Sequence, residues 1–113
     1  MATTQQIPGL TRTDLQQHDL SAPGREMIQN KVDIAPDAPV IRHWHPGEEI
    51  IYVLEGSLEY EIDGEPPKTV SAGEALMVPA EAVHSVRNVG DGNAAELATY
   101  VVEKDKPLLN LAQ

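Results

Sequence analysis

Cysteine and phenylalanine are both absent from this chain of 113 residues. Without cysteine the chain can form no disulfide bond, carries no thiolate nucleophile and holds no metal through sulfur. A metal would therefore have to be bound by histidine and carboxylate side chains. The aromatic residues are so few that we expect a core of aliphatic side chains; they are Trp44, Tyr52, Tyr60 and Tyr100.

Positive charge and long apolar runs are also scarce. Eight lysine and arginine residues stand against 18 aspartate and glutamate residues, and the formal net charge is −10. Such a surface repels phosphate backbones and anionic lipid head groups, so we expect no nucleic acid and no membrane partner. No apolar run reaches the roughly 20 residues that span a bilayer, and residues 1–20 lack the apolar stretch of a signal peptide. We therefore expect a cytoplasmic location, although a chain whose leader had been removed would have the same pattern.

The chain does contain a series of short strand patterns. Hydrophobic residues make up 41% of it, enough for one packed core, and eight glycines and nine prolines indicate frequent turns. After residue 24, apolar and polar residues alternate with the period of half-buried strands. Strands are predicted at 26–35, 40–45, 49–54, 57–63, 68–71, 75–78, 83–89 and 96–103, while Pro107 weakens a further edge strand at 106–113. About eight short strands and no helix predict an all-β sandwich or barrel.

The N-terminal residues 1–22 are predicted to form an arm, and residues 23–113 the barrel domain. Residues 11–15 could form one capped helical turn. Because the arm carries four aliphatic side chains that need apolar contact, we expect it to pack on the barrel or on a partner subunit.

Two of the four histidines, His43 and His45, stand two residues apart just before a Pro-Gly turn. Residues two apart on a strand point to one side, with Cα atoms about 6.5–7 Å apart. Both rings could then reach one ion at about 2.0–2.1 Å, and Glu49, after the turn, could direct its carboxylate to the same point. The alternative is that all three are solvated groups at a strand edge, and the spacing leaves the two interpretations about even.

The sequence resembles the cupin family over residues 37–88. The first cupin motif is Gly, five residues, His-x-His, three or four residues, Glu, six residues and Gly; it is matched by His43, His45, Glu49 and Gly56. The second is Gly, five residues, Pro-x-Gly, two residues, His, three residues and Asn; it is matched by Gly73, Pro79, His84 and Asn88. Two motif glycines are replaced, by Asp37 and Glu81, and glutamate adopts a positive φ less readily than aspartate.

This resemblance implies a double-stranded β-helix, the jelly-roll barrel, with one divalent transition metal bound by His43, His45, Glu49 and His84. The assignment of His84 depends on the resemblance. Glu49 is also the expected catalytic base, which could leave the metal during the reaction. The resemblance gives Asn88 a structural role, and His18, in the polar arm, is expected to be solvated.

Three imidazoles and one carboxylate suit Fe, Mn, Ni, Cu, Co or Zn and leave one or two positions for water, dioxygen or substrate. We expect a mostly apolar pocket for a small organic molecule with oxygen donors, lined by Ile51, Val53, Tyr60, Met77 and Val86. The first functional hypothesis is a metal-dependent oxidoreductase of the dioxygenase type, acting on a small enolisable or phenolic compound. The alternatives are a lyase or isomerase that needs no dioxygen, and a non-enzymatic cupin that binds a small ligand or a metal.

A homodimer is also predicted. A lone barrel of this size would expose sheet edges and an apolar outer face that includes Ile50, Tyr52 and Leu54. Pairing of two chains through that face would bury it.

Overall fold

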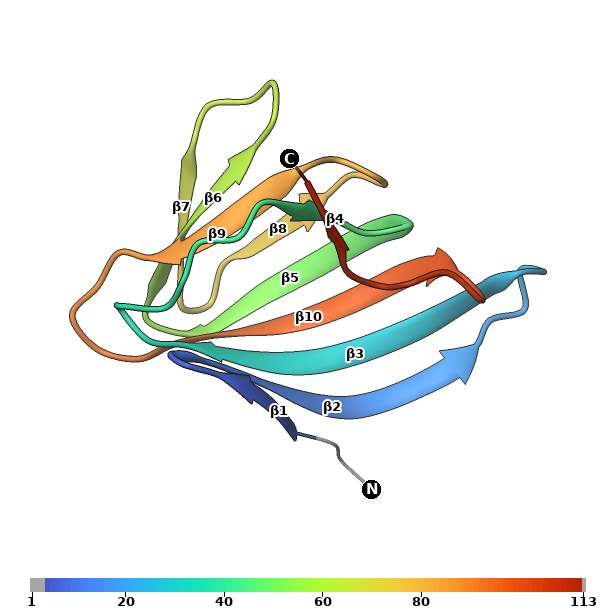
Figure 1. Ribbon diagram of the computed structural model, residues 1–113, viewed down its shortest axis with the longest axis horizontal. Coiled ribbons are helices and arrows are strands. Elements are labelled where there is room, and N and C mark those ends of the chain that lie inside the picture. Colours follow the sequence, from blue (N-terminus) through green and yellow to red (C-terminus); the bar gives the residue numbers. More distant parts are fainter. Residues whose placement is uncertain (1–3, 113) are drawn as a thin grey trace.

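The protein folds as two antiparallel sheets that face each other in the computed structural model, which describes the backbone of residues 4–112 and the side chains of residues 8–112 (Figure 1). The six-stranded sheet has the order β1 (Thr4–Ile7), β2 (Leu10–Asp19), β3 (Arg25–Ile34), β10 (Ala94–Glu103), β5 (Gly47–Glu55) and β8 (Ala75–Val78). The five-stranded sheet has the order β11 (Asn110–Leu111), β4 (His43–Trp44), β9 (His84–Asn88), β6 (Ser57–Ile62) and β7 (Lys68–Ser71). The predicted all-β jelly-roll fold is confirmed.

The aliphatic core lies between the two sheets. Alternation along β5 places Ile51 and Val53 in the core, both fully buried, while Ile50 and Tyr52 on the other face are each 46% exposed. One expectation for this region is wrong, because Met77 does not point inward. It pairs with Ile50 in the β5–β8 ladder and is 54% exposed on the outer face. In a strand of only four residues that is apolar throughout, the alternation that would have assigned the face is missing.

The N-terminal residues extend the six-stranded sheet. Residues 10–19 form β2, which pairs with β3 on both sides of a register shift between Asp14 and Gln16, so the helical turn suggested for residues 11–15 is absent. A single isolated helical turn costs more conformational entropy than its hydrogen bond returns, whereas an extended chain here completes the ladder with β3. The division of the chain into residues 1–22 and 23–113 stays a prediction.

The turn before β9 keeps the left-handed conformation in spite of its glutamate. Glu81, at the position of the motif glycine, has a φ of 63°. Its backbone N–H donates to the carbonyl of His45 at 3.1 Å, and the N–H of Ala82 donates to the carbonyl of Pro79 at 3.2 Å. These bonds connect the β8–β9 turn to the end of β4.

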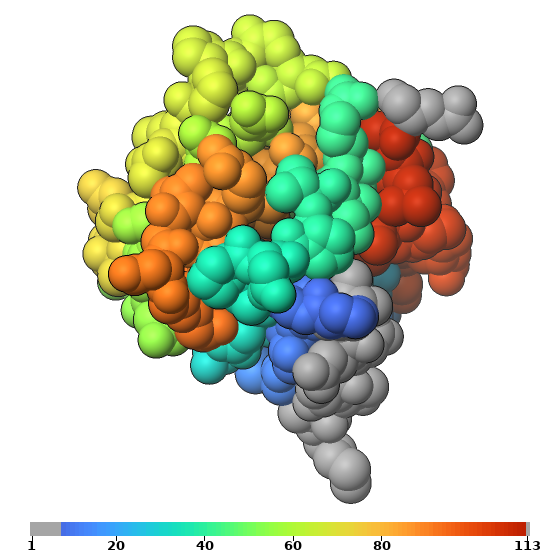
Figure 2. Space-filling view, turned by 60° about the vertical axis from the view of Figure 1, so that its left-hand side comes forward, coloured from blue at the N-terminus to red at the C-terminus, as the bar shows by residue number. Residues whose placement is uncertain are grey.

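The connection between β3 and β4 runs across the molecular surface. Figure 2 shows this teal and green segment between the orange β9–β10 turn and the red C-terminal segment. The connection carries Pro39 and Ile41 to the mouth of an internal cavity.

In the part of the chain that the structure describes, no helix is long and apolar enough to cross a membrane. The cytoplasmic location and the exclusion of nucleic acid stay predictions.

Candidate metal centre

Three histidines from two neighbouring segments meet inside the barrel. His43 on β4 stands directly opposite His84 on β9, and their ring centroids are 4.3 Å apart. The ring of His45, one residue beyond β4, lies 4.9 Å from that of His43 and 5.1 Å from that of His84. One ring nitrogen from each histidine lies within 4.8 Å of the other two.

Backbone carbonyls fix the orientation of all three rings. The Nδ1 atoms of His43, His45 and His84 lie 2.8, 2.7 and 2.9 Å from the carbonyl oxygens of Ile41, Leu108 and Ala82. A carbonyl only accepts hydrogen bonds, so each Nδ1 must carry the proton and donate it. In the neutral rings the lone pair is therefore on Nε2, which is the arrangement that metal-binding histidines use.

Glu49 lies beside two of these rings. Its Oε1 is 3.2 Å from Nε2 of His45 and 3.1 Å from Nε2 of His84, and only 3% of the residue is exposed. Burial alone would raise the pKa of Glu49, but the adjacent imidazoles of His45 and His84 outweigh it and lower the pKa to about 2. The side chain is therefore a buried carboxylate at neutral pH.

The net pKa shifts of His43 and His84 have opposite signs. Burial, followed by the proximity of His84, lowers the pKa of His43 to about 4. Burial also acts to lower the pKa of His84, but its hydrogen bond to Glu49 outweighs this and raises the pKa. Both effects follow from packing ionisable rings around one carboxylate in an apolar interior.

This donor set fits a divalent transition metal. Nε2 of His45 is buried and has no hydrogen-bond partner among the described residues, although it lies close to Glu49. A buried polar atom without a partner is unfavourable, and a metal ion would satisfy it together with the other two Nε2 atoms. The structure brings together all four residues predicted as ligands: His43, His45, Glu49 and His84.

The candidate ligands open into a cavity of about 150 Å³. Tyr60 and Val86 line it as expected, whereas Ile51 and Val53 belong to the core and Met77 lies outside. The other apolar lining residues come from β2, β3, the β3–β4 connection and the segment before β11; they are Leu10, Val32, Pro39, Ile41 and Leu109.

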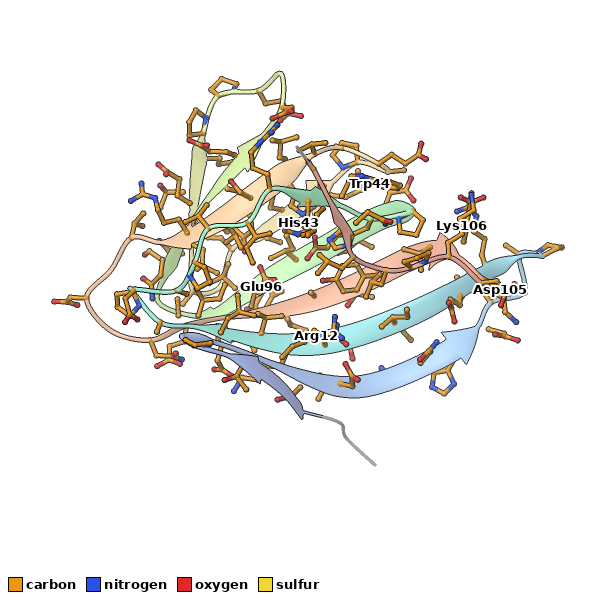
Figure 3. The ribbon with its side chains drawn as sticks, in the orientation of Figure 1. Arg12, His43, Trp44, Glu96, Asp105 and Lys106 are labelled. Carbon is orange, nitrogen blue, oxygen red and sulfur yellow. The ribbon has the colours of Figure 1, made fainter. Side chains whose placement is uncertain are left out.

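Three polar lining residues were not predicted: Arg12, Glu96 and Tyr100. Figure 3 labels Arg12, Glu96 and His43, which all face this cavity between the two sheets. Glu96 is 4% exposed and accepts a hydrogen bond of 2.5 Å from the hydroxyl of Tyr60. Burial, followed by the charge of Glu49, raises the pKa of Glu96 to about 8. The sequence could have indicated that Glu96 points inward, because residues two apart on a strand share a face and Glu96 lies on the same face of β10 as Ala98 and Tyr100.

The remaining two residues singled out in the sequence lie apart from the centre. Asn88 is buried, donates to the carbonyls of Ile34 and Gly92 at 2.8 Å each, and accepts from the N–H of Gly90 at 2.8 Å. These bonds give it the structural role that the sequence implied. His18 is exposed on β2.

Comparison with known proteins agrees with the fold. A family model described as a cupin domain matches residues 30–102. The polyketide synthase CurC of Streptomyces cyaneus is 43% identical over 60 residues, which cover 52% of this chain and 38% of CurC. The chain therefore spans less than half the length of this curated relative.

Solved structures share the fold. The polyketide cyclase RemF of Streptomyces resistomycificus superposes with a TM-score of 0.74 at 21% identity, over 99% of this chain and 80% of RemF. An oxalate oxidase in complex with the substrate analogue glycolate superposes with a TM-score of 0.70 at 27% identity, over 92% of this chain and 55% of the oxidase.

Proposed function

This chain belongs to the cupin family, and from that premise we propose that it is an enzyme that uses one divalent transition metal bound by His43, His45, Glu49 and His84. The observation that supports the proposal most strongly is the set of three carbonyl-bound Nδ1 atoms, which directs three Nε2 lone pairs toward one region. Solvated surface histidines would gain nothing from this shared arrangement.

The proposed reaction is a dioxygenase-like oxidation of a small enolisable or phenolic compound. When bound, the metal would act as a Lewis acid toward the oxygen atoms of the substrate. The apolar walls of the cavity would exclude water, and Glu49 would accept a proton from the substrate. The similarity to an oxalate oxidase that binds glycolate supports a small ligand with oxygen donors.

Oxygen uptake tests this reaction. Protein loaded with Fe or Mn would be screened against diketones, flavonols and oxalate, with free metal and the His45→Ala variant as controls. We expect oxygen consumption by the wild type that exceeds both controls. Oxygen consumption no faster than with free metal would count against the proposed dioxygenase-like reaction.

A lyase or isomerase reaction without dioxygen is the second candidate. Glu96 favours it, because a buried acid that lines the same cavity as the candidate ligands can exchange a proton with a substrate but cannot transfer electrons. The similarity to a polyketide synthase and a polyketide cyclase also fits non-oxidative chemistry on enolisable compounds. Product formation under strict anaerobic conditions would favour this reaction, and retained metal without turnover in either atmosphere would favour a non-enzymatic binding protein.

We also propose that the functional unit is a homodimer. The outer face of β5 and β8 carries four large apolar residues, and the exposed fraction of each lies between 43% and 54%. They are Ile50, Tyr52, Leu54 and Met77. Pairing of two copies through this face would remove it from water. A light-scattering mass equal to one chain would contradict the dimer.

A further inference from the structure

Glu96 is a buried carboxyl group whose two directly paired residues in the sheet are apolar. Its partners in the ladders of β10 are Val32 on β3 and Val53 on β5, both buried and apolar. Its hydrogen bond comes instead from the opposite sheet, where the hydroxyl of Tyr60 donates to Oε1 at 2.5 Å. Burying a carboxyl group among aliphatic side chains is unfavourable for folding, and such groups concentrate at functional sites.

The cavity gives Glu96 neighbours of several kinds. Several other ionisable side chains line the same cavity as Glu96; they are Arg12, His43, His45, Glu49, Tyr60, His84 and Tyr100. Glu49 is a carboxylate at neutral pH, so a second negative charge in the same apolar space is disfavoured. Tyr60 acts in the opposite direction, because its hydroxyl donates to Oε1 and stabilises the ionised form. In the metal-free protein, burial followed by the charge of Glu49 raises the pKa of Glu96 to about 8, so this carboxyl group can hold and release a proton near neutral pH.

We propose that Glu96 is a catalytic proton carrier, which exchanges a proton with the carbon next to the carbonyl group of a small carbonyl compound in the cavity. This inference rests on the proposed function and narrows its substrate class to compounds with an acidic C–H bond beside a carbonyl. Glu96 and the four candidate ligands line one cavity of about 150 Å³, so a small compound held at the ligands lies within the space that Glu96 faces.

The proton transfer balances without any further reactant. In one direction the Glu96 carboxylate takes the proton, the C–H bond breaks, and its electron pair moves into the enolate of the substrate. In the other direction the protonated carboxyl group gives its proton to the enolate carbon, a C–H bond forms, and the electron pair of the O–H bond stays on Glu96. The Tyr60 hydroxyl donates to the resulting carboxylate, and exchange with water can replace the proton that was transferred.

The protonation state can be tested without any activity. Infrared spectra of the metal-free wild type and of metal-free Glu96→Gln would be compared between pH 6 and pH 10. We expect a carbonyl stretching band of a protonated carboxylic acid in the wild type that fades as the pH rises, and no such band in the variant. A wild-type spectrum without this band, or one that Glu96→Gln leaves unchanged, would overturn the proposal.

Deuterium exchange tests the transfer itself, with pyruvate as the probe. Protein loaded with Mn and free Mn would each be incubated with pyruvate in D₂O, and loss of the methyl proton signal would be followed by NMR. We expect the wild type to accelerate exchange over free Mn, and Glu96→Gln to lose about 10²-fold of that rate while it binds the same amount of metal. Glu61→Gln, which changes an exposed carboxylate next to Tyr60, is the matched control and should exchange like the wild type.

The outcomes of these experiments separate a catalytic role of Glu96 from a role in supporting the metal site. Exchange by Glu96→Gln at the wild-type rate would refute the proposal, and so would loss of metal from this variant, because Glu96 would then support the metal. A wild type that holds metal but does not accelerate exchange would refute the proton carrier and leave the metal site standing. A wild type that holds no metal would instead refute the proposed function. Should Glu96→Gln not fold, Tyr60→Phe retains the acid, and we expect slower exchange and a higher infrared midpoint from it.

Discussion

Replacement of Glu81 by glycine should stabilise the protein. Glu81 has a φ of 63°, a conformation that costs an L-residue roughly 1–2 kcal/mol and costs glycine none. Glycine loses more conformational entropy on folding, which offsets roughly 0.5–1 kcal/mol of this gain. The residue is exposed, so its side chain contributes little. We therefore expect Glu81→Gly to raise the free energy of unfolding by about 1 kcal/mol.

This change in free energy corresponds to a measurable shift in Tm. Unfolding entropy near 60 °C is about 2.1 cal/mol/K per residue, and for 113 residues this amounts to about 0.24 kcal/mol/K. A gain of 1 kcal/mol would thus raise Tm by about 4 °C. Differential scanning calorimetry in the presence of a chelator would measure the shift without a contribution from metal binding.

Two control variants separate the backbone effect from a side-chain effect. Glu81→Ala keeps the strain and removes the side chain, so its Tm should stay within about 1 °C of the wild type. Asp105→Gly changes a second residue with a positive φ, 65°, and should also stabilise, but less, because aspartate tolerates this region better. If Glu81→Ala stabilised as much as Glu81→Gly, the reasoning from backbone strain would be refuted.

Four further substitutions test the site, the fold and the assembly. His45→Ala should lose bound metal, measured by elemental analysis, while its circular dichroism stays that of a folded β protein; wild-type metal content would contradict the ligand assignment. In metal-free protein, the pKa of Glu96 rises from 4.5 to about 8 on folding, so the folded state binds its proton more tightly and stability is lost as the pH rises through this interval. Glu96→Gln should remove up to roughly 5 kcal/mol of this pH dependence in denaturant titrations, and parallel curves for both proteins would refute it. Tyr52→Glu should reduce the light-scattering mass to that of one chain, because it places a charge on the exposed face of β5, and an unchanged mass would exclude this face as the interface. Gly47→Ala should destabilise by about 3 kcal/mol or more, because its Cβ would overlap the backbone carbonyl oxygen of Val101; an unchanged Tm would contradict the close approach of β5 and β10.

The strands that carry the metal centre could be predicted because their information is local. His43 and His45 stand at strand spacing beside a turn, and the alternation in residues 57–63 directly gives the buried side chains of β6. The position of His84 is different, because it meets His43, 41 positions earlier in the chain, only through pairing of β4 with β9. No local pattern encodes that pairing, so the resemblance of the second motif had to supply it.

The features that were missed depend on contacts between distant segments. Strand β2 is polar enough to be interpreted as an arm that packs on the barrel or on a partner subunit, and only its ladder with β3 makes it part of the sheet. Glu96 stands directly after a register shift in the β10–β5 ladder, and this irregularity of pairing is not visible in the sequence. A charged residue on an otherwise apolar strand face is normally assigned to the solvent side, and here the partner that makes burial tolerable, Tyr60, lies in the opposite sheet.

Through the hydrogen bond from His45 to the carbonyl of Leu108, the C-terminal segment helps to orient one of the candidate ligands. Leu108 lies 63 residues further along the chain, and beyond it β11 pairs with β4 while the N–H of Ala112 donates to the carbonyl of Arg42. The ring of His45 is thus set by residues that neither sequence motif includes. Truncation of the chain after residue 106, or a bulky C-terminal tag that displaces Leu108, would allow the ring of His45 to rotate. Metal retention would then weaken although all four candidate ligands are still present in the sequence.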